Sequence, residues 1–157
     1  MKSKNIRIVL VEPIHPGNIG GAARAMKNMG FDNLHIVNPR KYPDPQAVWR
    51  AASANDVLES ASVVGSLDQA IGDCQFVVGT STRCRRIPWP ILDSRNFAER
   101  LSQLSTSEKV AILFGREDRG LTNEQLVRCN LHVQIPSSNK YSSLNLAMAV
   151  QIICYEI

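Results

Sequence analysis

Residues 6–30 read IRIVLVEPIHPGNIGGAARAMKNMG, and this stretch decides the fold. The aliphatic run Ile6–Val11 predicts a buried strand of the kind found in parallel sheets. Asn18 can then cap a helix over residues 19–29, in which the apolar positions recur at helical spacing. Gly30 supplies the left-handed residue that ends such a helix. A buried strand followed directly by an amphipathic helix is typical of a parallel α/β sheet.

The rest of the chain repeats this alternation. Further strands are predicted over residues 34–37, 76–79, 110–114 and 131–135. Further helices are predicted over residues 46–55, 67–71, 94–104 and 123–129, and from Leu144 to the end of the chain. Residues 80–93 contain two prolines and three arginines, which predict an irregular loop. We therefore expect one α/β domain over residues 1–157, a parallel sheet with helices on both faces.

The composition fits one globular domain with an aliphatic core. Apolar residues make up 44% of the 157 residues and aromatic residues only 6%, which favours a sheet lined by Val, Ile and Leu. The net charge of +4 permits a polyanionic partner without requiring one. The four cysteines form no CxxC pair, and no histidine cluster accompanies them. We therefore expect neither a metal site nor a disulfide framework.

The two ends of the chain carry expectations about its cellular context. The start shows no signal peptide, and no apolar run approaches the roughly 18 residues of a membrane span. We therefore expect a cytoplasmic protein that does not cross a membrane. The last predicted helix still runs at Ile157 without a stop signal, so we expect the natural protein to have a C-terminal extension.

The loop after the first strand does not match the common nucleotide-binding motifs. A dinucleotide fold would need GxGxxG here, and Ile19 stands where that spacing requires glycine. The acidic residue expected after the second strand is replaced by Asn38-Pro39. No Walker A motif occurs in the chain. A dinucleotide-dependent enzyme is therefore disfavoured.

Three loops are the candidate binding elements, because ligands of open parallel sheets bind beyond the carboxyl ends of the strands. The first holds Gly20-Gly21, which allow a backbone or a ligand to approach closely, and Arg24 one turn later. The second, GREDRGLT at 115–122, places four charges between two glycines. The third, 136–145, brings serines and an asparagine to a helix start, where hydroxyls and free amides can hold polar groups. Each loop taken alone fits a packing role as well as a binding role.

Together these loops resemble the three sequence motifs of the SpoU family of RNA ribose methyltransferases, which belong to the SPOUT class. The first motif is similar to NIGGAAR at 18–24, with Asn18 and Arg24 six residues apart. The second is similar to LFGRE at 113–117 followed by Gly120-Leu121. The third is similar to SLNLAMA at 143–149. The motifs occur in the family's order, and the resemblance covers essentially the whole chain.

The resemblance implies a fold, a methyl donor and an assembly. The fold is a parallel sheet whose C-terminal segment forms a deep trefoil knot, which periodicity alone would not suggest. The methyl donor is S-adenosylmethionine, held at the knot, and the assembly is a homodimer whose active site is completed by the partner chain. By residue match, the implied cofactor contacts are Thr80, Ser81, Thr82, Gly115, Ile135, Ser142, Ser143 and Leu144.

Within the family, the closer likeness is to members that methylate tRNA at the start of the anticodon loop. Residues 7–12, the Trp89-Pro90 loop and residues 141–146 carry this likeness. The implied product is a 2′-O-methylated cytidine or uridine at position 32, and a wobble-nucleotide or rRNA target is the alternative. A non-catalytic RNA-binding module is an alternative of another class. It would account for the basic loop and the net charge, but not for the combination of Asn18, Arg24 and Glu117.

The basic loop that follows the strand over 76–79 is the expected RNA contact. Its arginines, Arg83, Arg85 and Arg86, are suited to binding phosphates. Trp89 could stack on a splayed base or pack at the dimer interface, and the sequence favours neither.

The implied reaction is methyl transfer to a ribose 2′-hydroxyl, a very weak acid. The protein must therefore remove the hydroxyl proton or stabilise the developing alkoxide. Arg24 is the candidate catalytic residue, either as a cation or as the general base that the resemblance raises, although a guanidinium gives up its proton reluctantly. Asn18 and Glu117 are expected to position Arg24 or the ribose. Ser143 and Asn145 are expected to order the third loop and the target nucleotide.

Overall fold

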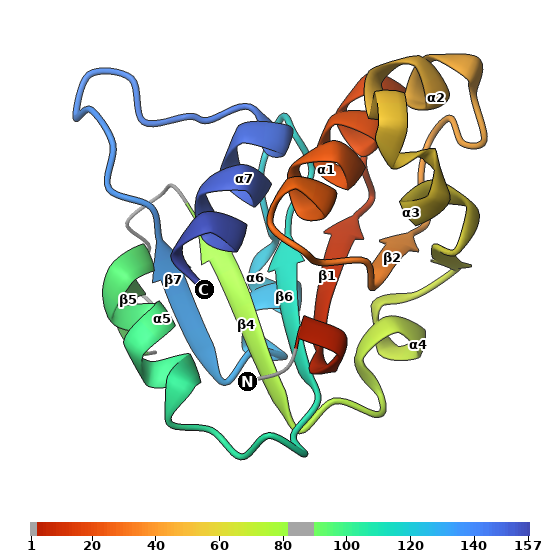
Figure 1. Ribbon diagram of the computed structural model, residues 1–157. Helices are drawn as coiled ribbons and strands as arrows, with labels where there is room; N and C mark the ends of the chain where they lie inside the picture. The colour runs from red at the N-terminus through yellow and green to blue at the C-terminus, as the bar shows by residue number, and fades with distance from the viewer. Residues whose placement is uncertain (1–2, 82–89) are drawn as a thin grey trace.

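A parallel sheet forms the centre of the computed structural model, which describes residues 3–81 and 90–157 (Figure 1). Seven strands lie within these residues, in the order β3-β2-β1-β6-β4-β7-β5, and every neighbouring pair is parallel. The strands are β1 (Ile6–Val11), β2 (Leu34–Val37), β3 (Ser62–Val64), β4 (Phe76–Ser81), β5 (Ile91–Asp93), β6 (Val110–Phe114) and β7 (Leu131–Gln134). The predicted α/β class with a parallel sheet is therefore confirmed.

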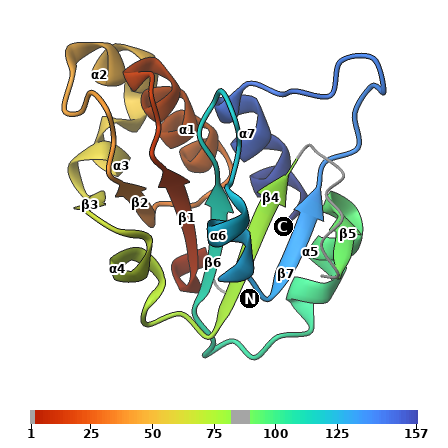
Figure 2. The same ribbon diagram turned by 180° about the vertical axis from the view of Figure 1, so that it is seen from behind.

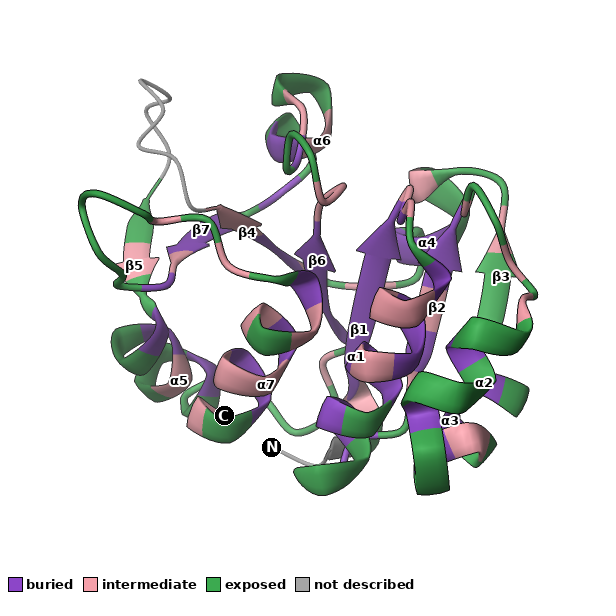
Figure 3. Cartoon of the chain, turned by 90° about the horizontal axis from the view of Figure 1, so that it is seen from above, coloured by how far each residue is buried: buried purple, intermediate pink, exposed green. Residues whose placement is uncertain are grey.

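Helices cover both faces of the sheet. The helices are α1 (Pro16–Asn28), α2 (Pro45–Ala51), α3 (Asn55–Glu59), α4 (Leu67–Ile71), α5 (Ser94–Ser102), α6 (Asn123–Val127) and α7 (Leu146–Glu156), with short 3-10 turns at Ser3–Asn5 and Ala52–Ala54. Seen from above, α5, α7, α1, α2 and α3 form one layer (Figure 3). The opposite face carries α4 and α6 (Figure 2). No described helix is both long and apolar enough to cross a membrane.

The central strand β1 explains why two cores form. All six of its residues are buried, and successive side chains point to opposite faces of a strand. Ile8 and Leu10 enter the larger core beneath α1 and α7. Val9 and Val11 enter the smaller core beneath α4 and α6. A strand covered on both faces needs aliphatic residues on both, and five of the six residues of β1 are aliphatic. The sixth, Arg7, is buried with its guanidinium donating to Asp73 at 2.7 Å.

The elements that the sequence did not predict lie at the edges. The strands β3 and β5 are three residues long and largely exposed, so they lack the apolar pattern by which a strand is recognised. The strand β5 lies within residues 80–93, for which only an irregular loop was predicted. The continuous helix predicted over 46–55 is also wrong, because α2 ends at Ala51. Ala52 has a φ of 50°, a left-handed conformation that interrupts the helix.

The predicted start of α1 is wrong as well. The helix begins at Pro16, with His15 at the N-cap, and Asn18 lies inside its first turn. Proline is well suited to this first position, because its fixed φ and missing N–H cost nothing there. The side chain of Asn18 is therefore not used as a cap and is free to make other contacts. Gly30 does adopt the predicted left-handed conformation, with a φ of 82°.

The paired glycines of α1 bring two neighbouring helices against its backbone. A Cβ atom added at Gly20 would lie 2.0 Å from the carbonyl oxygen of Ala47 in α2. A Cβ atom added at Gly21 would lie 2.9 Å from the Cβ atom of Ala147 in α7. Both glycines are therefore packing residues, and through Gly21 the N-terminal motif is placed directly beside the C-terminal one.

We predict that Gly20→Ala lowers the free energy of unfolding by about 1–3 kcal/mol or more, because the added methyl group has no space against α2. Gly17→Ala is the matched control. It lies in the same helix, and its nearest neighbour, Arg50 Cγ, would be at an ordinary 3.5 Å. That control should change stability by less than about 1 kcal/mol. Urea unfolding of both variants makes the comparison, and equal losses would contradict the close approach of α2.

Candidate functional site

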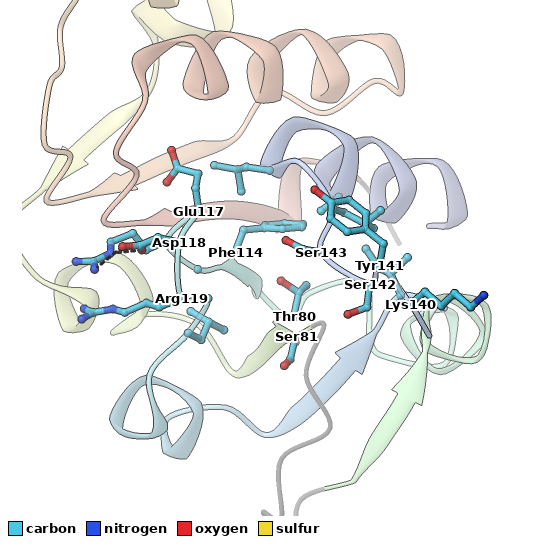
Figure 4. A pocket seen from close by; sticks show the side chains of 18 residues that line it. Thr80, Ser81, Phe114, Glu117, Asp118, Arg119, Lys140, Tyr141, Ser142 and Ser143 are labelled. Carbon is cyan, nitrogen blue, oxygen red and sulfur yellow. Dashed lines mark hydrogen bonds and ion pairs between the residues drawn. The ribbon is translucent and has the colours of Figure 1, made fainter. Parts of the chain in front are cut away.

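A pocket of about 380 Å³ lies at the carboxyl edge of the sheet (Figure 4). Thr80 and Ser81 at the end of β4 contribute to one wall. The β6–α6 loop contributes residues 114–121, and the β7–α7 loop contributes residues 140–144. Ile135, Leu146 and Ala149 complete the lining. The volume falls within the range of small-molecule sites in proteins.

Two glycines shape the β6–α6 loop. A Cβ atom at Gly115 would lie 2.2 Å from the backbone of Gly120 and Leu121, so only glycine fits there. Gly120 has a φ of 70°, and its N–H donates to the carbonyl oxygen of Arg116 at 2.7 Å. The resulting tight turn holds residues 116–119 at the mouth of the pocket.

The carboxylate of Glu117 leaves this loop and binds the start of α1. It accepts hydrogen bonds from the backbone N–H groups of Ile14, at 2.9 and 3.0 Å, and His15, at 2.8 Å. These groups precede a helix N-terminus, where a negative charge is favourable. Glu117 therefore performs from another loop the function that a local N-cap side chain would otherwise have.

Asn18 and Asn145 extend this contact into a chain of side chains. The Nδ2 atom of Asn18 donates to Glu117 at 3.2 Å, and its Oδ1 atom accepts from Asn145 Nδ2 at 3.1 Å. Asn145 is also the N-cap of α7, because its Oδ1 atom accepts from the N–H of Ala147 at 2.9 Å. Glu117, Asn18 and Asn145, one side chain from each of the three motifs, are thus joined by hydrogen bonds; we call these three side chains the Glu117 relay.

The β7–α7 loop presents unpaired backbone groups to the pocket. Within the described residues, the N–H groups of residues 141–144 have no protein acceptor. Ser137 Oγ donates to the carbonyl oxygen of Ser142 at 3.2 Å, which helps to hold the loop in place. The side chains of Ser142 and Ser143 line the pocket in the same segment (Figure 4). The loop therefore offers several hydrogen-bond donors to a polar ligand.

The opposite rim of the pocket is charged. Arg116 forms a two-point ion pair with Asp118, at 2.5 and 2.8 Å. This guanidinium holds the pKa of the Asp118 carboxyl below its usual value. Arg119 reaches Glu12 at 3.4 Å. Sequence reasoning assigned no role to these arginines or to Asp118, although four charges between two glycines were the available signal.

The comparisons with known proteins agree with this geometry. A family model described as the SpoU rRNA Methylase family matches residues 5–155. The chain belongs to this family. A tRNA (cytidine/uridine-2'-O-)-methyltransferase TrmJ from Sodalis glossinidius is 56% identical over 153 residues, which cover 98% of this chain and 60% of that protein. The chain therefore spans about three fifths of that relative's length.

Solved structures of SpoU proteins have the same fold. The crystal structure of TrmJ from Z. mobilis ZM4 superposes with a TM-score of 0.90 at 37% identity, covering 96% of this chain and 67% of that one. The SpoU methyltransferase AviRb from Streptomyces viridochromogenes, solved in complex with the cofactor AdoMet, has a TM-score of 0.72 at 25% identity. That match covers 95% of this chain and 57% of AviRb.

The described residues that were expected to contact the cofactor all line the pocket. The pocket lining includes all of those that the structure describes: Thr80, Ser81, Gly115, Ile135, Ser142, Ser143 and Leu144. Thr82 lies outside the described residues, as do the expected RNA contacts Arg83, Arg85, Arg86 and Trp89. Lys140 and Tyr141 also line the pocket and were not predicted.

The residues expected to be catalytic separate into two groups. Glu117 and Ser143 line the pocket, and Asn18 and Asn145 are bonded behind Glu117. Arg24 is exposed on α1 and does not line the pocket of its own chain. Within the described part of the chain, its side chain makes no hydrogen bond or ion pair. The relay therefore does not reach Arg24 in a single chain.

We predict that Glu117→Gln lowers the free energy of unfolding by about 1–3 kcal/mol, because the amide nitrogen cannot accept from Ile14 or His15 and the charge is lost. Glu99→Gln is the matched control. Glu99 is exposed on α5, and its side chain has no partner among the described residues. Thermal or urea unfolding measures both, and an equally small effect would show that the Glu117 contacts contribute little.

Proposed function

We propose that this chain is the catalytic domain of an enzyme that methylates the 2′-hydroxyl of cytidine or uridine in tRNA, at position 32. S-adenosylmethionine is the proposed methyl donor. One observation carries the proposal: the second and third motif loops line one pocket, and Asn18 of the first motif is hydrogen-bonded to both Glu117 and Asn145 of these loops. The name of the Sodalis glossinidius relative supports the substrate class. The position within tRNA rests on the likeness of residues 7–12 and 141–146.

The chemistry of the pocket fits S-adenosylmethionine. Leu121, Ile135 and Leu144 offer an apolar surface to an adenine ring. The unpaired amides of residues 141–144 and the neighbouring serine hydroxyls can donate to its polar atoms. When bound, the cofactor supplies an electrophilic methyl group on a sulfonium.

Arg24 is the proposed catalytic residue, acting in the pocket of a partner chain. Its position outside its own pocket supports a homodimer whose active site is shared. Met29, the C-cap of α1, is exposed, and on the adjacent helix α7 Met148 and Tyr155 keep 63% and 73% of their surface. These apolar side chains are suited to a subunit interface. There, the Arg24 cation would stabilise the charge that develops on the 2′-oxygen as its proton leaves.

Asn18, Asn145 and Glu117 are proposed as positioning residues. Their relay fixes the first turn of α1, and with it the direction in which Arg24 leaves the helix. Ser143, whose hydroxyl lies at the pocket, is proposed to order the target ribose. Arg83, Arg85, Arg86 and Trp89 are proposed RNA contacts.

The deep trefoil knot belongs to the same proposal. Strand β4 lies between β6 and β7, so the segment after β7 must cross the carboxyl edge of the sheet before α7 packs against α1. That path supports a knotted C-terminal segment, and the agreement with AviRb and TrmJ structures supports it further.

We predict that S-adenosylmethionine titrated into the chain in a calorimeter binds at about one molecule per chain, and that NAD gives no heat. Arg24→Ala should keep this affinity within a few-fold. It should lower tRNA methylation by about 100-fold or more, the typical effect of removing one group that stabilises developing negative charge. Arg24→Lys, which keeps the charge, should retain more activity than Arg24→Ala.

Each other outcome has a definite meaning. Absence of S-adenosylmethionine binding by a folded chain would contradict the methyltransferase proposal and favour a non-catalytic RNA-binding module. Undiminished methylation by Arg24→Ala would remove Arg24 from the mechanism. Loss of cofactor binding in Arg24→Ala would place Arg24 in the cofactor site instead.

A further inference from the structure

An exposed tryptophan stands on α2, away from the pocket lining. Trp49 keeps 75% of its surface accessible, and Val48 beside it keeps 47%. Ala47 and Ala51, one turn apart, are buried against α1. Trp49 therefore projects from the solvent side of the helix. An indole at this exposure offers a flat face on which an unpaired nucleic-acid base can stack.

The arginines that lack an ionic partner concentrate beside this tryptophan. Nine arginines lie in the described residues, and five of them pair with a carboxylate: Arg7, Arg95, Arg116, Arg119 and Arg128. The other four are Arg24, Arg40, Arg50 and Arg100. Of these, only Arg100 lies outside the region formed by α1, α2 and the loop before α2. This region therefore carries positive charge that no carboxylate of the described residues pairs with.

The local acids are already engaged. Asp44 accepts from the N–H of Gln46 as the N-cap of α2 and pairs with Lys41 at 3.4 Å. Asp56 is bound by Lys27 at 2.9 Å. The guanidinium groups of Arg40 and Arg50 are thus left available to an outside anion.

Two contacts place Arg40 and Arg50 beside the start of α1, at the edge of the sheet that holds the pocket. Gln46 is three residues before Trp49 and four before Arg50, so it neighbours both on the surface of α2 and lies between them. Arg50 Cγ lies 3.5 Å from the position that a Cβ atom of Gly17 would take, so Arg50 lies over the first turn of α1. The N–H of Arg40 donates to the carbonyl oxygen of Pro13 at 3.0 Å. Figure 1 shows α2 beside the start of α1, beyond the carboxyl ends of the strands.

We propose that Trp49, Arg50 and Arg40 form a second RNA contact, separate from the basic loop over 83–89. An unpaired base stacks on the Trp49 indole, and the flanking phosphates bind Arg50 and Arg40. Unneutralised cations around a single aromatic ring fit a nucleic acid better than a second copy of the chain, whose contact would need a broader apolar patch. The proposal rests on the proposed tRNA substrate, which it deepens by extending the RNA footprint onto α2.

The test measures binding of an unmodified tRNA transcript by the chain at several salt concentrations, without a methyl donor. Trp49→Ala should weaken binding by about 5- to 150-fold, the usual effect of removing a stacking platform, and Trp49→Phe by much less. Arg50→Glu should weaken tRNA binding. It should also reduce the slope of log K against log salt concentration by about 1, the value for one lost phosphate contact. Arg100→Glu is the matched control, because it makes the same charge change on α5 at an exposed, unpaired arginine, and it should do little.

The proposal is contradicted if Trp49→Ala binds tRNA as the parent chain does, or if Arg50→Glu and Arg100→Glu weaken binding equally. Absence of tRNA binding by the parent chain also overturns it. A change in the oligomer mass of Trp49→Ala in solution would instead assign this face to a second copy. S-adenosylmethionine affinity is measured for every variant. This affinity should be the same in all variants. If the parent chain does not bind S-adenosylmethionine, that result contradicts the proposed function and leaves the RNA contact on α2 to be judged by the tRNA measurements.

Discussion

The carboxylate of Glu117 is the contact on which the rest of the site depends. It lies at the carboxyl end of β6, and it binds the N–H groups that open α1. Through Asn18 it also reaches Asn145, the cap of α7. Loops that are about 100 residues apart in the sequence are thereby held in fixed positions relative to one another. An ionised acceptor is well suited to this, because hydrogen bonds to a charged group are stronger than those between neutral groups.

The glycine pair of α1 supports the same arrangement from the other side. Gly20 lets α2 approach closely, and Gly21 lets Ala147 of α7 approach. With α7 fixed at Asn145 and Ala147, the β7–α7 loop closes one side of the pocket while the charged β6–α6 loop closes the other. The outward face of α1 and α2 is then left with arginines that have no ionic partner among the residues that the structure describes. This is consistent with substrate binding beside the cofactor pocket rather than within it.

The sequence predicted the central elements and the pocket lining better than it predicted their connections. Long aliphatic strands such as β1 carry a strong signal because they are buried on both faces. Short edge strands such as β3 do not, since their side chains are mostly exposed. Asn18 was predicted to cap α1, and no local pattern could indicate that Glu117, 99 residues later, takes that place. Arg24 was predicted from its motif, and its location outside the pocket follows from the direction of α1.

A double-mutant cycle between Asn18→Ala and Asn145→Ala tests most directly whether the three loops act as one unit. The free energy of unfolding is measured for the parent chain, both single variants and the double variant, so that the capping loss at Asn145 cancels. If Asn18 and Asn145 act through one relay, the double variant should lose less unfolding free energy than the two single variants together. The expected difference, the coupling energy, is about 0.5–3 kcal/mol. Additive losses would mean that the loops are held independently, and would contradict the central role given to Glu117 and its partners.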